Sequence, residues 1–214
     1  MTVSATLHPH RFRYLLAAEL ALIILHPFLG DRRDLLFGFL ALPTVVAGIY
    51  VVAADRRTVA IALALGLLAI AGNFTAGIEG FHGPGLACWM VFSVFVLIVV
   101  LRNVLLSADV SMDRFYGAIA AYLLIGVVWG MAYALLDIAS PGSFYSIRHP
   151  VRFTWEDFTF FSFVTLTSVG YGDMVPLSGH AKSLAVVESV LGVMYPAVLI
   201  GRLIGRHGQA RGSD

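Results

Sequence analysis

The stretch that decides the fold is WEDFTFFSFVTLTSVGYGD, residues 155–173. Its first part, residues 155–167, has the composition of an apolar helix, but it is shorter than the about 20 residues that a helix needs to cross a bilayer. An extended segment that contains Gly170 and Gly172 follows it. Because non-helical backbone at membrane depth is tolerated only where protein buries it or where it lines a water-filled cavity, the stretch predicts a re-entrant loop.

Polar residues mark the beginning of this short helix. Thr154 is a good N-cap residue, and Glu156 and Asp157 fall in the first turn, where the helix dipole favours carboxylates. The C-terminal end of the helix carries the partial negative charge of the dipole. We therefore expect the helix to begin near the outer surface and to end in the middle of the membrane.

The composition of the whole chain supports a membrane location. The chain has 214 residues, of which 59% are hydrophobic and 13% are charged, whereas ordinary globular domains are about 25% charged. This composition excludes a soluble domain. The net charge of +1 gives no support for a nucleic-acid partner. The single cysteine, Cys88, permits neither an intrachain disulfide nor a cysteine metal cluster.

Apolar runs separated by charged residues predict six membrane-spanning helices. These runs are 13–30, 35–54, 58–74, 86–101, 115–136 and 183–204. Pro27 and Pro43 are expected to kink or end their helices. We expect the first span to be retained, because the sequence that follows it does not resemble the small-residue cleavage site of a signal peptide.

The basic residues predict the orientation of the chain. Most of the 14 Lys and Arg residues fall on the side of the membrane that holds both termini. They are Arg11, Arg13, Arg56, Arg57, Arg102, Arg114, Arg202, Arg206 and Arg211. Because cytoplasmic loops carry an excess of Lys and Arg, both termini are predicted to be cytoplasmic.

The segment 165–173, TLTSVGYGD, resembles the selectivity filter of potassium channels, whose signature is T-x-x-T-x-G-Y-G-D. It departs from the signature at one position, where Ser168 replaces threonine. A Gly-x-Gly pair alone would more often be a simple turn. The resemblance implies that potassium ions are bound by the carbonyl oxygens of four residues and by a serine hydroxyl, with four chains completing each ring. The carbonyls belong to Ser168, Val169, Gly170 and Tyr171, and the hydroxyl to Ser168.

This arrangement needs unusual backbone angles. An ordinary strand directs successive carbonyls to alternating sides, whereas a filter needs them to point to one axis. Some residues must then adopt left-handed angles, which Gly170 and Gly172 do at the lowest steric cost. The resemblance also implies that Thr165, Thr167 and Asp173 support the filter.

The resemblance covers residues 115–206 and includes a candidate hinge. Gly192 stands where many potassium channels have the glycine hinge of the inner helix, and Pro196 weakens the helix further. These two residues predict either a gating hinge or a fixed bend. Below them, a hydrophobic constriction is expected to close the pore by dewetting. It would be formed by Leu199, Ile200 or Leu203.

The support of the filter departs from the pattern of well-studied relatives. Those relatives have a carboxyl at the position of Val164 and tryptophans near Phe160 and Phe161, which brace the filter aspartate. Asp173 must therefore find another partner. Glu188 is a second carboxylate within the membrane, and burying it unpaired would be costly. We expect it to support the filter through a hydrogen bond to a threonine of the short helix, or else to face a wet crevice.

The first four spans lack the marks of a voltage sensor. A sensor needs several Arg or Lys at three-residue spacing, but the fourth apolar run contains none and Arg102 stands alone at its end. Glu19 and His26 lie on one face of the first span, where they form either a proton-sensitive pair or structural hydrogen bonds. With Asp214 as the last residue, no cytoplasmic nucleotide-binding or calcium-binding ring is expected.

The sequence thus predicts an all-α membrane protein with six transmembrane helices, a re-entrant pore helix and a selectivity filter, assembled as a homotetramer around a central pore. The expected parts are a cytoplasmic N-terminus (1–12), a four-helix peripheral domain (13–106), a pore domain (107–206) and a cytoplasmic tail (207–214). The pore domain would contain an outer helix (115–136), a pore helix (154–167), a filter (168–173) and an inner helix (180–206).

The predicted function is passive, potassium-selective conduction without strong voltage gating, in the inner or plasma membrane. The expected partners are potassium ions, membrane lipids and copies of the same chain, and no cofactor is expected. No nucleophile paired with a base, phosphate loop or metal cluster suggests an enzyme. The alternatives are a non-conducting regulatory subunit and a component of a cation transporter.

Overall fold

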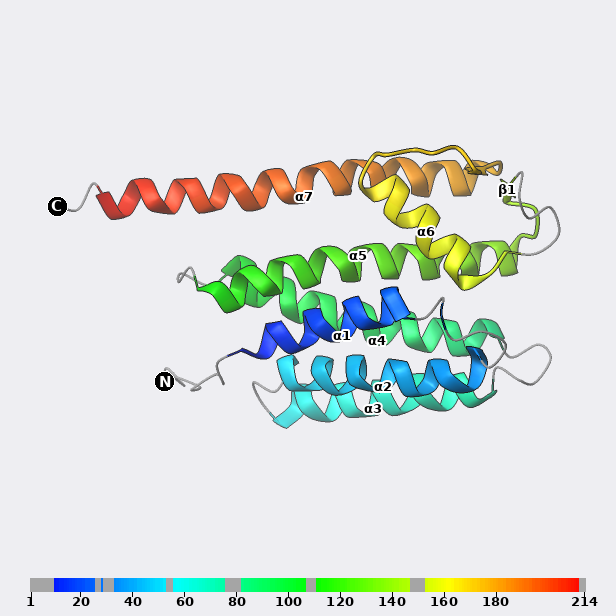
Figure 1. Cartoon of the computed structure of the whole chain (residues 1–214), viewed down its shortest axis with the longest axis horizontal. Helices are drawn as coiled ribbons and strands as arrows, with labels where there is room; N and C mark the ends of the chain where they lie inside the picture. The colour runs from blue at the N-terminus through cyan, green and yellow to red at the C-terminus, as the bar shows by residue number, and fades with distance from the viewer. Residues whose placement is uncertain are drawn as a thin grey trace. The chain divides into compact units, whose positions relative to one another are not determined.

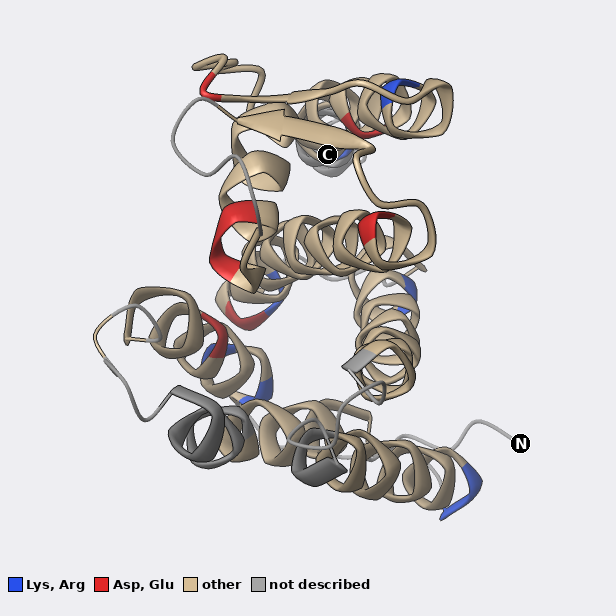
Figure 2. Cartoon of the chain, turned by 90° about the vertical axis from the view of Figure 1, so that its right-hand side faces the viewer, with Lys and Arg blue, Asp and Glu red and all other residues tan. Residues whose placement is uncertain are grey.

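The computed structural model describes residues 10–25, 28, 33–52, 56–75, 82–106, 111–146 and 153–211. For residues 33–41, 73–75, 82 and 203–211 it describes the backbone alone. Helices account for most of the described residues, which confirms a mainly helical protein. Figure 2 shows how few Lys, Arg, Asp and Glu residues these helices carry.

The elements follow one another in the order that the sequence predicts, with small differences in length. They are α1 (Arg11–Leu25), α2 (Arg33–Val52), α3 (Arg56–Thr75), α4 (His82–Leu106), α5 (Met112–Ala139), β1 (Phe144–Ser146), α6 (Trp155–Leu166), β2 (Met174–Pro176) and α7 (Gly179–Arg211). The two short strands were not predicted. Pro43 does not end α2, which continues to Val52, and Pro27 lies outside the described residues.

Three helices are long and apolar enough to cross a membrane: Gly83–Leu106, Met112–Ala139 and Gly179–Arg202. The helix α1 has 15 residues, which is less than a perpendicular span needs. The described part of the chain therefore supports a membrane protein that crosses the bilayer several times. The six predicted spans stay a prediction.

The chain forms two compact units, Met1–Val128 and Trp129–Asp214. The boundary between these units falls inside α5, and the predicted domain boundaries stay a prediction. In the first unit, α2 packs against α1, α3 and α4, around a core that includes Phe12, Leu15, Phe92 and Val96.

Close backbone contacts and one buried cation join the helices of the first unit. A Cβ at Gly72 would lie 2.7 Å from the Cα of Gly85, so α3 and α4 approach closely there. The guanidinium of Arg11 is buried and donates hydrogen bonds to the Val51 carbonyl and to Asn103 Oδ1, both at 3.2 Å. Glu19 is also buried, but neither of its carboxylate oxygens has a hydrogen-bond partner among the described residues. The structural hydrogen bond that we expected there is absent from this part of the chain, and His26 lies outside the described residues.

The second unit contains the end of α5, both strands, α6, the filter segment 168–173 and α7 (Figure 1). The strands pair antiparallel, with Phe144 opposite Pro176 and Ser146 opposite Met174. In Figure 1 the short helix α6 lies obliquely beside α7, and the extended chain that follows it runs back along the same helix. This unit therefore brings together every residue that the sequence analysis assigned to the filter and its support.

Candidate functional site

The helix α6, which the sequence predicts to be a pore helix, begins with the predicted cap. Thr154 has the extended backbone of an N-cap, and its hydroxyl accepts a hydrogen bond from the Asp157 N–H at 3.4 Å. In return, the Thr154 N–H donates to Asp157 Oδ2 at 2.7 Å, which completes a capping box. The helix begins at Trp155 and ends at Leu166. Its N-terminal boundary is therefore fixed by a specific polar contact.

The filter segment has left-handed backbone angles at every second residue. The φ angles are +58° at Ser168, +60° at Gly170 and +76° at Gly172. A Cβ at either glycine would meet nothing within 4 Å of it, so the angle and not a lack of space requires glycine. Ser168 was not expected to join this pattern, and a non-glycine residue there stores backbone strain of about 1–2 kcal/mol.

Backbone hydrogen bonds attach the start of the filter to the end of α6. The N–H groups of Val169 and Gly170 both donate to the Val164 carbonyl, at 2.9 and 3.4 Å. The Ser168 N–H donates to the Thr165 carbonyl at 3.0 Å. These amides point back to the pore helix, so the position of α6 fixes the position of the filter.

The two predicted support threonines lie at the same junction. The Thr167 hydroxyl donates to the Phe163 carbonyl at 2.6 Å, within its own helical turn. Thr165 contributes the carbonyl that accepts from Ser168. Both residues therefore shape the end of α6 locally, and their role toward an ion stays a prediction.

The filter residues 168–172 are exposed in the single chain. The exposed fraction is 53% for Val169 and 70% for Tyr171. The ring of Tyr171 stacks on the ring of Phe160, with centroids 5.9 Å apart and an interplanar angle of 2°. Phe160 thus stands in direct contact with Tyr171 of the predicted filter.

Asp173 finds its partner in the adjacent backbone. Its Oδ1 accepts a hydrogen bond from the Met174 N–H at 3.1 Å. The residues that follow form β2, which pairs with β1, and the Leu177 N–H donates to the Ser143 carbonyl at 2.8 Å. The exit of the filter is therefore held by the loop that follows α5, a link that the sequence did not reveal.

Glu188 is fully buried and joins three helices. Tyr133 on α5 donates its hydroxyl hydrogen to Glu188 Oε2 at 2.6 Å, and Ser162 on α6 donates to Glu188 Oε1 at 2.5 Å. The expected pore-helix partner is thus a serine, not a threonine, because Ser162 occupies the turn of α6 that faces this carboxyl. The alternative of a wet crevice is wrong within the described part of the chain, since Glu188 has an exposed fraction of 0%.

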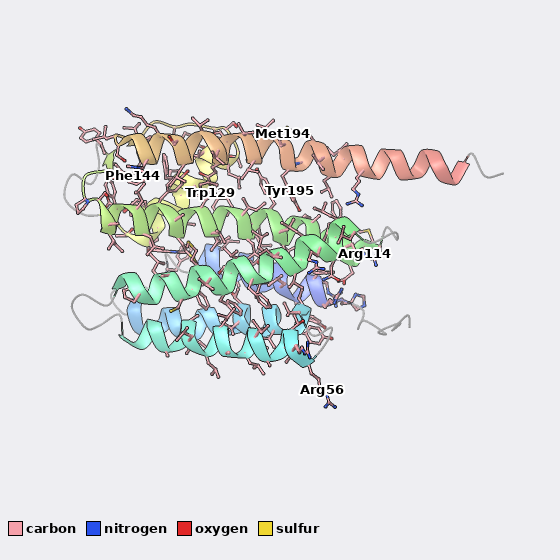
Figure 3. All side chains as sticks on the ribbon, turned by 180° about the vertical axis from the view of Figure 1, so that it is seen from behind. Arg56, Arg114, Trp129, Phe144, Met194 and Tyr195 are labelled. Atoms are coloured by element: carbon pink, nitrogen blue, oxygen red, sulfur yellow. The ribbon has the colours of Figure 1, made fainter. Side chains whose placement is uncertain are left out.

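Aromatic rings surround the hydroxyl partner of this carboxyl. The ring of Tyr133 makes edge contacts with Phe161 and Phe144, at centroid distances of 5.0 and 5.5 Å. The ring centroid of Trp129, on the same helix, lies 6.0 Å from that of Tyr133. Figure 3 labels Trp129 together with Phe144. These contacts hold the Tyr133 ring in place. The role of Tyr133 was not predicted, because nothing in the local sequence pattern distinguishes it from other aromatic residues of an apolar helix.

The predicted hinge glycine is a point of close helix contact. A Cβ at Gly192 would lie 2.7 Å from the carbonyl carbon of Leu166 and 3.0 Å from its Cα, so α7 touches the backbone at the end of α6. The helix α7 continues through Gly192 and Pro196 to Arg211. This contact gives a packing reason for the glycine, and the hinge stays a prediction.

The predicted constriction is only partly described. Leu199 is half-buried and Ile200 is 55% exposed in the single chain, whereas the side chain of Leu203 lies outside the described residues. Among the described residues, the apolar side chain of Ile200 is thus left exposed by this chain at the position of the predicted constriction. The gate stays a prediction.

Comparison with known proteins shows a family for residues 119–206. A family described as "Ion channel" matches residues 119–206. Protein LctB of Bacillus caldotenax is 31% identical over 101 residues, which covers 44% of this chain and 72% of that protein. Protein LctB of Geobacillus stearothermophilus is 43% identical over 49 residues, which covers 23% of this chain and 36% of that protein. No solved structure matches the chain significantly.

Proposed function

The chain belongs to the ion channel family, and from this premise we propose that four copies form a potassium-selective pore. The observation that carries the proposal is the alternation of left-handed residues in the filter, at Ser168, Gly170 and Gly172. Such an alternation supports carbonyls that point in one direction instead of alternating as in a strand. Rings of backbone carbonyls replace the hydration shell of potassium in selectivity filters.

Exposed apolar surface supports assembly from several copies. One filter segment supplies one wall of a pore, and its Val169 and Tyr171 side chains are exposed in the single chain. Only 11% of the most apolar part of α7 is buried within the chain. Exposed apolar residues occur all along this helix, at Val186, Val190, Val193, Met194, Val198 and Ile200. A tetramer would cover part of this surface with other copies, and lipid would cover the rest.

The same proposal includes a membrane topology and a mode of gating. Both termini would be cytoplasmic, as the distribution of basic residues favours. The helix α4 carries Arg102 as its single Lys or Arg, and each gating charge contributes about 2.3 kcal/mol per 100 mV. Steep voltage dependence is therefore not expected. The region Gly192–Ile200 would contain the moving or constricting part of the pore.

Reconstitution of the purified chain in liposomes tests the proposal. With potassium and sodium on opposite sides, the reversal potential should lie close to the potassium equilibrium potential. Gly172→Ala should abolish this selectivity, because its φ of +76° is costly for any residue with a Cβ. Gly179→Ala is the matched control, since a Cβ there meets nothing within 4 Å.

The outcome separates the proposal from its alternatives. A non-conducting regulatory subunit would give no flux of potassium or of sodium. A component of a cation transporter would give slow flux that lacks discrete channel openings. Equal permeability for sodium and potassium in the unmodified protein would refute the potassium-selective pore.

A further inference from the structure

We propose that Glu188 is a positioning residue for the filter, whose carboxyl fixes the pore helix α6 and thereby determines how strongly the pore discriminates between potassium and sodium. The inference rests on the proposed function, since it concerns the selectivity of the same pore. The two Glu188 oxygens accept hydrogen bonds from Tyr133 and Ser162, neither of which is a filter residue. Glu188 acts through α6, to which the filter is attached.

The Glu188 carboxyl is buried and hydrogen-bonded, so it has a defined position. Its exposed fraction is 0%, in the middle of a helix that is long and apolar enough to cross the membrane. A carboxyl at that depth is expensive unless polar groups satisfy it. Each of its two oxygens accepts a hydrogen bond, one from Ser162 at 2.5 Å and one from Tyr133 at 2.6 Å. The carboxyl therefore has a defined position with respect to two other helices.

The inner helix α7 contacts the pore helix α6 at two places, which lie one helical turn apart. Glu188 and Gly192 are four residues apart on α7, and their contacts, Ser162 and Leu166, are four residues apart on α6. Residues four apart lie one turn apart on the same face of a helix. The hydrogen bond at Glu188 and the backbone contact at Gly192 thus hold one face of α6 against one face of α7. Two contacts fix both the separation and the rotation of the pore helix.

The filter is attached to the segment between these two contacts. Val164 lies between Ser162 and Leu166, and its carbonyl accepts hydrogen bonds from the N–H groups of Val169 and Gly170. A rotation of α6 about its axis would therefore move this carbonyl and the first residues of the filter together. Carbonyl rings select potassium through the positions of their oxygens, so a small displacement at this level alters the permeability ratio.

The third helix supplies a fixed reference for the carboxyl. Tyr133 is itself fully buried, and its ring is enclosed by Phe144 and Phe161. Its hydroxyl therefore holds Glu188 Oε2 at a position set by α5. Without the hydrogen bond from Tyr133, the Glu188 side chain could move together with Ser162. The helix α6 would then be connected through this carboxyl to α7 but not to α5.

The alternative is that Glu188 only fills space and stabilises the fold. The two roles predict different effects on selectivity when an apolar side chain of the same length replaces Glu188. If the residue is filler, Glu188→Met preserves the selectivity of every assembled channel, because methionine packs readily in apolar interiors. If it is a positioning residue, Glu188→Met assembles but leaves two buried hydroxyls without their acceptor, and α6 shifts to satisfy them.

The experiment measures potassium-to-sodium permeability ratios in liposomes for the unmodified protein and three variants. Glu188→Met should lower the ratio about tenfold or more, which corresponds to about 1.4 kcal/mol of lost discrimination. Ser162→Ala removes the hydrogen-bond donor on α6, and it should also lower the ratio. Glu188→Gln should stay within about threefold of the unmodified protein, because an amide can accept from one hydroxyl and donate to the other.

Ser189→Ala serves as the matched control for a polar change on α7. The Ser189 hydroxyl donates to the Ala185 carbonyl of its own helix at 2.8 Å, and among the described residues it has no hydrogen bond to α6, so the ratio should not change. An unmodified protein without potassium selectivity would refute the proposed function and with it this inference. A selective unmodified protein whose Glu188→Met and Ser162→Ala variants keep the same ratio would overturn the inference alone.

Discussion

Replacing Gly192 by alanine inserts a methyl group where the inner helix α7 meets the backbone of Leu166 at the end of α6. The new carbon would lie 2.7 Å from the Leu166 carbonyl carbon, and ordinary van der Waals contact begins at 3.4 Å. The Leu166 carbonyl oxygen would lie closer still, so the two helices must separate by more than the about 0.7 Å that the carbonyl carbon alone requires, because a backbone atom cannot rotate away as a side chain does.

The expected cost follows from two opposing effects. Overpacking of a well-packed interior typically costs about 1–3 kcal/mol, whereas alanine is a better helix former than glycine by about 1 kcal/mol. We expect Gly192→Ala to destabilise the assembled protein by about 1–2 kcal/mol in net terms. If Gly192 served only as a flexible hinge, the methyl group would meet no obstacle and the substitution would stabilise the helix.

Gly201→Ala is the matched control, because it makes the same change on the same helix where a Cβ meets nothing within 4 Å. Thermal unfolding of both variants in detergent, followed by the helical circular dichroism signal, should place Gly192→Ala below the unmodified protein. Gly201→Ala should lie at or above it. Equal or higher stability of Gly192→Ala would refute the packing argument, and single-channel recording would then decide whether the glycine serves as a hinge.

Three further substitutions test separate contacts. Phe160→Leu removes the stacked partner of Tyr171, a contact worth about 0.5–1.5 kcal/mol, and should lower the potassium-to-sodium permeability ratio; an unchanged reversal potential would argue against this brace. Arg11→Met removes two hydrogen bonds of a buried guanidinium, each worth about 1.5–3 kcal/mol, and should lower the thermal midpoint, whereas exposed Arg13→Met should not; equal midpoints would contradict the assigned contacts. Thr154→Ala removes a capping box and should cost about 1 kcal/mol, measured by thermal unfolding; no loss would show that the cap is dispensable.

Short-range chemistry explains why the cap of α6 and the left-handed glycines that follow this helix could be predicted from the sequence. The cap depends on Thr154 and Asp157, three residues apart, and both the start of α6 and the capping residue agree with the prediction. The left-handed angles at Gly170 and Gly172 also follow from residue type alone. Ser168 shows the limit of that reasoning, because its positive φ comes from the continuation of the same alternation and not from a preference of serine.

Contacts between distant segments could not be predicted in the same way. Tyr133 and Glu188 are 55 residues apart, and an apolar helix offers no periodic signal that indicates which tyrosine faces a carboxyl. The pairing of β1 with β2 depends on three-residue strands that are too short for a recognisable alternation. Gly192 could be noticed in the sequence, but its contact with Leu166 depends on how two helices pack.

A density map of the assembled particle in potassium tests the central claim most directly. We predict a fourfold particle in which the carbonyl oxygens of residues 168–171 face the symmetry axis, with ion density between successive rings. A monomeric or dimeric particle, or a filter segment whose carbonyls turn away from the axis, would contradict the proposed pore.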